Sequence, residues 1–135
     1  MLWAKLRKLD IRFPEIFPIN SVRAMRGCFY AMQENNLPQY AEAIFRSYWQ
    51  EGKNIGNLDI LLDIANHSGF DPDKYKNFIE SSCAKDLLIQ NTDELIKRGG
   101  FGSPTFFYQN HMFLEMIGSL FLRNYSKKAI LKNNP

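Results

Sequence analysis

The chain has 135 residues, of which 45% are hydrophobic and 23% charged, so its size and composition are those of one ordinary globular domain. No apolar run approaches the roughly 18 residues that a membrane helix needs. The charged first residues also lack the apolar region of a signal peptide. We therefore expect a cytoplasmic protein without a membrane partner.

The net charge of +3 does not indicate a nucleic-acid-binding face. Four basic residues lie within the last 13 positions without an acidic neighbour: Arg123, Lys127, Lys128 and Lys132. The rest of the chain carries 13 basic and 14 acidic residues and is almost neutral. Because a basic tail alone is weak support for such an interface, we expect no nucleic-acid partner.

The spacing of cysteine and histidine predicts no metal site. Cys28 and Cys83 are far apart and form no Cys-x-x-Cys pair, which favours two idle thiols in a reducing compartment. His67 and His111 have no ligand partner at a suitable spacing, so we expect them on the surface or in loops.

The chain opens with helical spacing and then becomes extended. Leucines at positions 2, 6 and 9 are spaced as at the end of a helix. Pro14 and Pro18 then force an extended connection, since proline restricts both itself and the residue before it.

Two helices are expected next. The first follows Asn20 or Ser21 as N-cap, and one of its faces carries Val22, Met25, Phe29 and Met32. The second opens at Leu37-Pro38 and stops at Gly52, with an apolar face formed by Tyr40, Ala43, Ile44, Ser47 and Tyr48.

Helical spacing continues to about residue 98. A short helix within residues 57–69 is closed by Gly69. Asp71 as N-cap and Pro72 at the first helical position predict a clear helix start. A break is expected near Ser81-Ser82, and Gly99-Gly100 ends the helical part.

Only after residue 100 does the pattern change to that of strands. Thr105–Tyr108 and Met112–Phe113 are expected as two short strands around a turn at Gln109-Asn110. A lone two-stranded hairpin is marginally stable in water. Because no other stretch has a strand pattern, the hairpin indicates a sheet whose other strands are not in this sequence.

Four stretches carry a family resemblance: FPINSVRAMRG at 17–27, FRSYWQEGKNIGNLDIL at 45–61, GGFGSPTFF at 99–107 and HMF at 111–113. Together they resemble the DsbA-like branch of the thioredoxin superfamily. The similarity is greatest to the 2-hydroxychromene-2-carboxylate isomerases and kappa-class glutathione transferases, and it runs from about Trp3 to Phe113.

The resemblance implies a mainly α fold of two parts. Residues 1–98 would form the helical insertion domain of a DsbA-like thioredoxin fold. Residues 99–135 would form the late part of the thioredoxin-like domain, with a cis-proline loop, a β-hairpin remnant of the sheet and a terminal helix.

The resemblance also implies a glutathione site at Asn20, Ser103 and Pro104. Pro104 would be cis and would turn the backbone of Ser103 toward the cysteinyl backbone of glutathione. Asn20 matches the asparagine of a Phe-Pro-x-Asn motif beside that site. From the residues alone, 99–104 is equally a helix stop and turn, and Asn20 equally an N-cap. The Tyr48-Trp49 pair is more typical of a core than of a substrate contact.

In the family, a serine or cysteine at a helix N-terminus follows the first strand and favours a thiolate. The resemblance places that turn before Met1, so no residue is predicted to be catalytic. We expect a truncated, inactive relative of small-molecule isomerases that can self-associate through its exposed cleft face. The alternatives are a fragment of a thiol-disulfide oxidoreductase, which a Cys-x-x-Cys turn would identify, and a non-catalytic helical interaction remnant.

The family continues after Phe113 with Gly-x-Asp-Arg-Leu, whereas this chain has LEMIGSL. The codons TTG GAA ATG ATA GGC TCN would encode LEMIGS, and the same string read from its third nucleotide encodes Gly-Asn-Asp-Arg-Leu. We therefore hypothesise that residues 114–135 are an out-of-frame reading. A coding sequence in which Leu114 does not end in G, or in which Glu115 is GAG, would contradict it.

Overall fold

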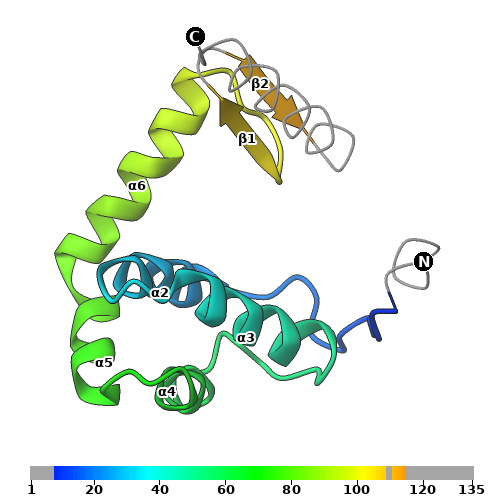
Figure 1. Cartoon of the computed structure of the whole chain (residues 1–135), viewed down its shortest axis with the longest axis vertical. Coiled ribbons are helices and arrows are strands. Elements are labelled where there is room, and N and C mark those ends of the chain that lie inside the picture. Colours follow the sequence, from blue (N-terminus) through cyan, green and yellow to red (C-terminus); the bar gives the residue numbers. More distant parts are fainter. Residues whose placement is uncertain (1–7, 109–110, 115–135) are drawn as a thin grey trace, which may run out of the picture. The chain divides into compact units, whose positions relative to one another are not determined.

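The computed structural model describes residues 8–108 and 111–114 (Figure 1). Close packing divides the chain into two compact units, residues 1–90 and 91–135, which are described separately below. The domain boundary expected after residue 98 falls where the last helix of the described residues ends, and it stays a prediction. Several predictions concern residues outside the described ranges. These are the helical spacing at the start of the chain, the terminal helix and, except at Leu114, the frameshift hypothesis.

The described residues are mostly helical, as the sequence predicts. Five helices follow one another in the order α2 (Val22–Gln33), α3 (Leu37–Trp49), α4 (Leu58–His67), α5 (Pro72–Glu80) and α6 (Ser82–Lys97). Within the first unit, α2 packs on α3 and α5, and α4 packs on α3 and α5 (Figure 1). None of these helices combines the length and the apolar character that crossing a lipid bilayer requires.

The helix starts follow from local side-chain chemistry. The Asp71 carboxylate accepts hydrogen bonds from the backbone N–H groups of Asp73 at 3.0 Å and Lys74 at 3.1 Å, which caps α5. The Asn57 side chain caps α4 in the same way. The break expected near Ser81-Ser82 is confirmed, since Ser81 separates α5 from α6 and its hydroxyl accepts from the Ala84 N–H.

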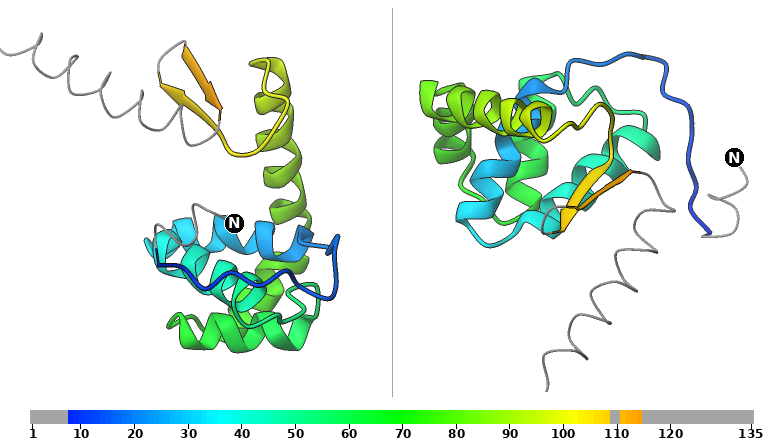
Figure 2. Two further views of the ribbon diagram at one scale, coloured as in Figure 1. Left: turned by 90° about the vertical axis from the view of Figure 1, so that its right-hand side faces the viewer. Right: turned by 90° about the horizontal axis from the view of Figure 1, so that it is seen from above.

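An extended segment precedes α2, as the two prolines predict (Figure 2). Two hydrogen bonds join it to the end of α3. The Arg12 N–H donates to the Trp49 carbonyl at 2.8 Å, and the Tyr48 hydroxyl donates to the Ile16 carbonyl at 3.0 Å. These contacts place the segment beside α3 and fix the approach of the chain to Asn20.

The core of the first unit is a cluster of aromatic rings. Tyr30, Tyr40, Phe70 and Tyr75 are all buried, and their rings contact one another edge-on, tilted or stacked. The Tyr40 hydroxyl donates to the Ala24 carbonyl at 3.0 Å and lies 2.7 Å from the Tyr75 hydroxyl. Both hydroxyls are therefore satisfied inside an otherwise apolar core.

The α2 helix packs on this core with the face that carries Tyr30 and three small residues. Ala24, Gly27, Tyr30 and Ala31 are buried, and a Cβ at Gly27 would overlap both tyrosine hydroxyls. The opposite stripe predicted from the sequence stays exposed, at 45% for Val22, 47% for Met25 and 56% for Met32. Close approach of two bulky tyrosines thus decides which face of α2 packs.

The second unit contains the end of α6, a loop and a hairpin. Gly99 has a φ of +82°, which ends the helix as the glycine pair predicts. Strands β1 (Thr105–Tyr108) and β2 (His111–Leu114) pair antiparallel, with Phe106 opposite Phe113. The second strand is one residue longer at each end than the predicted range Met112–Phe113. The Arg98 guanidinium lies 3.7 Å from the centre of the Phe107 ring.

Candidate functional site

Asn20 lies exposed at the start of α2 and acts as its cap. Its side-chain oxygen accepts a hydrogen bond from the Val22 N–H at 3.1 Å, whereas the formal N-cap residue Ser21 makes no such bond. The side-chain NH2 of Asn20 donates to none of the residues that the structure describes. The side-chain oxygen of Asn20 therefore caps α2, and its NH2 group has no acceptor among the described residues.

The loop before α4 lies close to the backbone of Asn20. A Cβ at Gly56 would lie 3.1 Å from the Asn20 carbonyl oxygen and 3.0 Å from the Asn54 side-chain oxygen. That Asn54 oxygen accepts from the Gly56 N–H at 2.9 Å. Glycine at position 56 thus permits two loops from the resembling stretches 17–27 and 45–61 to meet, which neither stretch reveals alone.

Ser103 and Pro104 lie together in the second unit, exposed, directly before β1. The Ser103–Pro104 peptide bond is cis. The Thr105 hydroxyl donates to the Gly102 carbonyl across this turn. Within the described ranges, no residue forms a backbone hydrogen bond with Ser103. The N–H and C=O of Ser103 are accordingly of the kind that an extended peptide ligand can pair with.

Tyr48 and Trp49, the aromatic pair at the end of α3, lie in two different environments. Tyr48 is buried, which agrees with its interpretation as a core residue. Trp49 is half-buried and lines a groove between α3 and the extended segment. The volume of this groove is about 860 Å³, and its other apolar residues are Leu9, Ile11, Pro38, Ala41 and Phe45. The sequence pattern does not reveal this groove, because it forms only when the extended segment lies beside α3.

Cys28 does not have the environment of a nucleophile. Cys28 is half-buried, its thiol lies 3.7 Å from the Ala24 carbonyl, and burial raises the pKa of that thiol. A raised pKa keeps the group protonated and unreactive at neutral pH. Cys83 is exposed at the start of α6, and both thiols are free.

The imidazole of His67 is engaged on its own helix. Its Nδ1 lies 2.8 Å from the Asp63 carbonyl oxygen and 3.3 Å from a carboxylate oxygen of the same residue. Among the described residues there is no group of three or more histidine, cysteine, aspartate or glutamate side chains that could hold a metal ion.

Comparison with known proteins finds similarity to isomerases in sequence and in structure. It is 28% identical over 113 residues to a 2-hydroxychromene-2-carboxylate isomerase of Pseudomonas putida, covering 82% of this chain and 54% of that protein. An isomerase of the same name from Pseudomonas sp. (strain C18) is 27% identical, with 82% and 51% covered. The chain thus spans about half the length of these relatives.

The structural likeness agrees. A solved 2-hydroxychromene-2-carboxylate isomerase superposes with a TM-score of 0.79 at 27% identity, covering 96% of this chain and 66% of that one. The family model for the DSBA-like thioredoxin domain matches residues 1–125. The chain therefore belongs to the DSBA-like thioredoxin domain family.

Proposed function

We propose that this chain is the helical and late part of a glutathione-dependent isomerase of the 2-hydroxychromene-2-carboxylate type, and that these 135 residues alone are inactive. The observation that carries the proposal is the likeness to isomerases over 82% of the chain in sequence and 96% in structure. The resemblance assigns the nucleophile-bearing turn to the part of the relatives that this chain does not cover.

Glutathione, when bound, would supply the thiolate that attacks the unsaturated ring compound. The residues of this chain would hold and orient it. The exposed N–H and C=O of Ser103 can pair with a peptide backbone as a neighbouring strand does. The side-chain NH2 of Asn20 can donate a further hydrogen bond while its oxygen continues to cap α2.

The thiol of Cys28 gives no support for thiol-disulfide exchange by these residues themselves; a Cys-x-x-Cys turn in the part of the relatives that this chain does not cover would favour that alternative. Exchange requires a thiolate, and a low thiol pKa favours it. Burial instead raises the pKa of Cys28, so this residue is poorly suited to the task. A thiol that arrives with the ligand needs no activated cysteine on these helices.

The test compares the chain alone with a completed chain. Purified chain, mixed with glutathione and 2-hydroxychromene-2-carboxylate, should isomerise the substrate no faster than free glutathione does. A chimera should restore glutathione binding, measured by calorimetry, and glutathione-dependent turnover. It joins this chain to the part of the P. putida isomerase that the chain does not cover.

A matched pair of variants separates ligand binding from helix capping in the chimera. Asn20→Asp keeps the capping oxygen and removes the NH2 donor, so it should weaken glutathione binding without lowering the melting temperature. Ser21→Ala should change neither quantity. Turnover by the unextended chain, or a folded chimera that does not bind glutathione, would contradict the proposal.

A further inference from the structure

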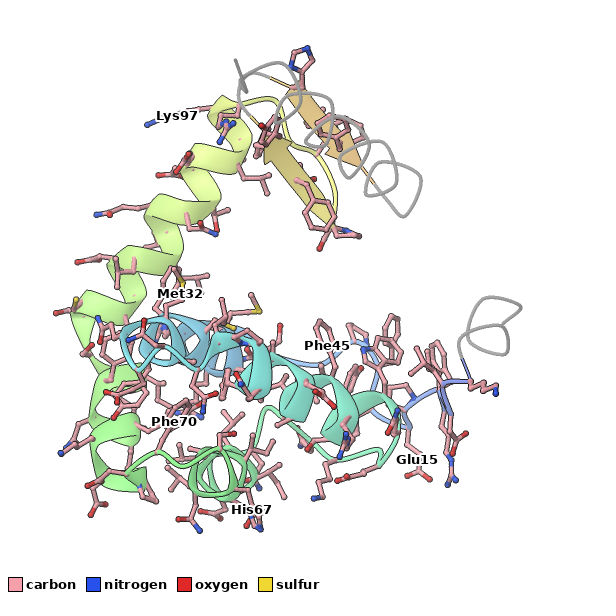
Figure 3. All side chains as sticks on the ribbon, viewed as in Figure 1. Glu15, Met32, Phe45, His67, Phe70 and Lys97 are labelled. Atoms are coloured by element: carbon pink, nitrogen blue, oxygen red, sulfur yellow. The ribbon has the colours of Figure 1, made fainter. Side chains whose placement is uncertain are left out.

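Three phenylalanines stand out on the surface around the groove beside α3, and all of them belong to the first unit. Phe45, which lines the groove, is 63% exposed. Phe13 and Phe17, on the extended segment, are 66% and 57% exposed. Phe45 lies on the side of α3 that faces away from α4 (Figure 3). Large apolar side chains that are exposed together mark a surface that a partner covers.

The rings of Phe13 and Phe17 form one projection, which we call the aromatic knob. They contact each other in a tilted arrangement with 5.0 Å between the ring centres, and neither lines the groove. Hydrogen bonds from the Arg12 N–H and to the Ile16 carbonyl hold the segment beside α3, and Pro14 restricts the backbone between them. Because this backbone is already held, covering the knob costs little conformational entropy.

The groove lies close to the knob on the same segment. Ile11 lines the groove and Phe13 belongs to the knob, so at most about 7 Å of backbone separates the two features. The groove has apolar walls and a volume of about 860 Å³, within the range that accepts a compact apolar group. A face that carries both a projection and a hollow can pair with a second copy of itself about a two-fold axis.

The charges around this face are balanced. Asp10 and Arg12 form an ion pair at 3.1 Å. Glu42 and Arg46 at the edge of the groove form another at 2.7 Å. Residues 8–17 as a whole carry two basic and two acidic side chains. Two copies therefore meet without a net like charge, and this balance favours an uncharged partner face over a charged ligand.

The exposed apolar area suffices for a weak dimer. The exposed parts of the three phenylalanines amount to nearly two whole side chains, about 300 to 450 Å². Leu9 and Ile16 on the same segment are 50% and 49% exposed and add to this area. Two copies would therefore bury roughly 1,000 Å² in total, which is the lower limit for a specific interface. Because interfaces of that size are weak, a dissociation constant in the micromolar range is expected.

We propose that two copies of this chain pair through this face, with the knob of each copy inserted into the groove of the other. The two rings of the knob then pack against Phe45 and Trp49 of the facing copy, and the same contacts recur across the two-fold axis. The proposal assigns residues to the self-association expected from the sequence. It uses none of the residues assigned to glutathione.

The test measures the mass of the full chain by sedimentation equilibrium across the micromolar range, without glutathione. We expect a reversible equilibrium between monomer and dimer. Phe13→Ser in the knob and Phe45→Ser in the groove should each weaken the dimer by at least about tenfold, because each change removes an aromatic contact twice per dimer. Met32→Ser is the matched control, since Met32 is equally apolar, 56% exposed on α2 and outside the groove lining. It should leave the equilibrium unchanged.

Mixing the two weakened variants tests the reciprocal geometry. The Phe13→Ser chain keeps an intact groove, and the Phe45→Ser chain keeps an intact knob. A mixed pair therefore retains one complete contact, which neither variant can form with itself. The mixture should dimerise more strongly than either variant alone. Circular dichroism of each variant checks that the fold persists, as expected for exposed positions.

Three results would overturn the proposal. A monomer throughout the concentration range would assign the groove to another occupant, such as the part of the relatives that this chain does not cover. Association that Met32→Ser weakens as much as Phe13→Ser does would be non-specific apolar contact. A mixture that associates no better than its components would exclude the reciprocal geometry. Because the measurement needs neither glutathione nor substrate, its failure leaves the isomerase proposal intact, and the reverse holds as well.

Discussion

At the scale of single residues, Gly27 determines how closely α2 approaches the aromatic core. The hydroxyls of Tyr40 and Tyr75 occupy the space that a Cβ at this position would need. Neither tyrosine can retreat easily, because both are completely buried and their hydroxyls are joined at 2.7 Å. The absence of a side chain at Gly27 is thus a packing requirement, although glycine usually weakens a helix.

Gly27→Ala should destabilise the protein by about 1 to 3 kcal/mol, the usual cost of overpacking a well-filled core. At an open helical position the same change stabilises by up to about 1 kcal/mol, so the sign of the effect is diagnostic. Urea unfolding followed by circular dichroism measures it. Gln33→Ala, at an exposed position of α2, is the control and should have little effect. A stabilised Gly27→Ala variant would show that the tyrosines move apart.

The same tyrosines should make the protein sensitive to alkali. Burial is the main cause that raises the pKa of Tyr75 to about 12, and it raises the pKa of Tyr40 further. An unfolded tyrosine has a pKa of about 10, so the folded state holds these protons over a range in which the unfolded state releases them. Their stabilising contribution is complete below pH ~10 and is lost as the pH rises through the folded value.

The free energy of unfolding should therefore fall between about pH 10 and 12, by about 1.4 kcal/mol per pH unit for each of the two tyrosines. Guanidinium unfolding at a series of pH values measures the slope. Tyr75→Phe should give a shallower slope in this range, and the lysines, unchanged in the variant, serve as the internal reference. Identical slopes would mean that Tyr75 ionises freely in the folded protein.

At the scale of elements, the helix starts differ in how much the residue at the N-cap position contributes to stability. Asp71 satisfies two backbone N–H groups of α5, whereas Ser21 satisfies none of α2. We expect Asp71→Ala to cost about 0.5 to 2 kcal/mol and Ser21→Ala to be nearly neutral. Thermal unfolding of the two variants beside the parent chain measures both. Equal losses would contradict the assignment of the caps.

The helices were predictable because their signals are local. Asp71-Pro72, Gly69 and the break at Ser81-Ser82 each act over a few residues, and the structure has the expected starts and stops there. Which face of α2 packs was not predictable. Its larger apolar stripe invites burial, but the decision comes from Tyr40 and Tyr75, residues distant in the sequence that require a small face.

The candidate sites also differ in whether a short stretch of sequence reveals them. Asn20, Ser103 and Pro104 could be proposed because the resemblance resides in short contiguous stretches. The contact between the Asn20 carbonyl and Gly56 joins two such stretches, and no spacing rule reveals it. The groove was missed for a related reason, since Leu9 and Ile11 line it only after two hydrogen bonds attach the extended segment to α3.

At the scale of the whole molecule, the packed core belongs to one unit. Its buried members run from Ala24 to Ile79, all within residues 1–90. The second unit contains a two-stranded hairpin with partly exposed Phe106 and Met112 on its two faces, which is marginal in water by itself. The two units should therefore differ greatly in their capacity to fold alone.

A polypeptide of residues 1–90 should unfold cooperatively, with a thermal midpoint close to that of the full chain. Residues 91–135 alone should show no cooperative transition. Calorimetry of both pieces and of the parent chain measures this. A piece 1–90 that fails to fold would mean that the late residues complete the core, which the contacts within the first unit do not indicate.

The contrast between the two thiols offers a means of observing the protein in solution. At neutral pH a maleimide reagent should react first with Cys83, which is exposed, and spare Cys28, whose thiol burial keeps protonated. A fluorescent or spin label would thus be attached in the first turn of α6 without any substitution. Because α6 begins in one compact unit and ends in the other, the label's rotational freedom would report how rigidly that helix is held in solution.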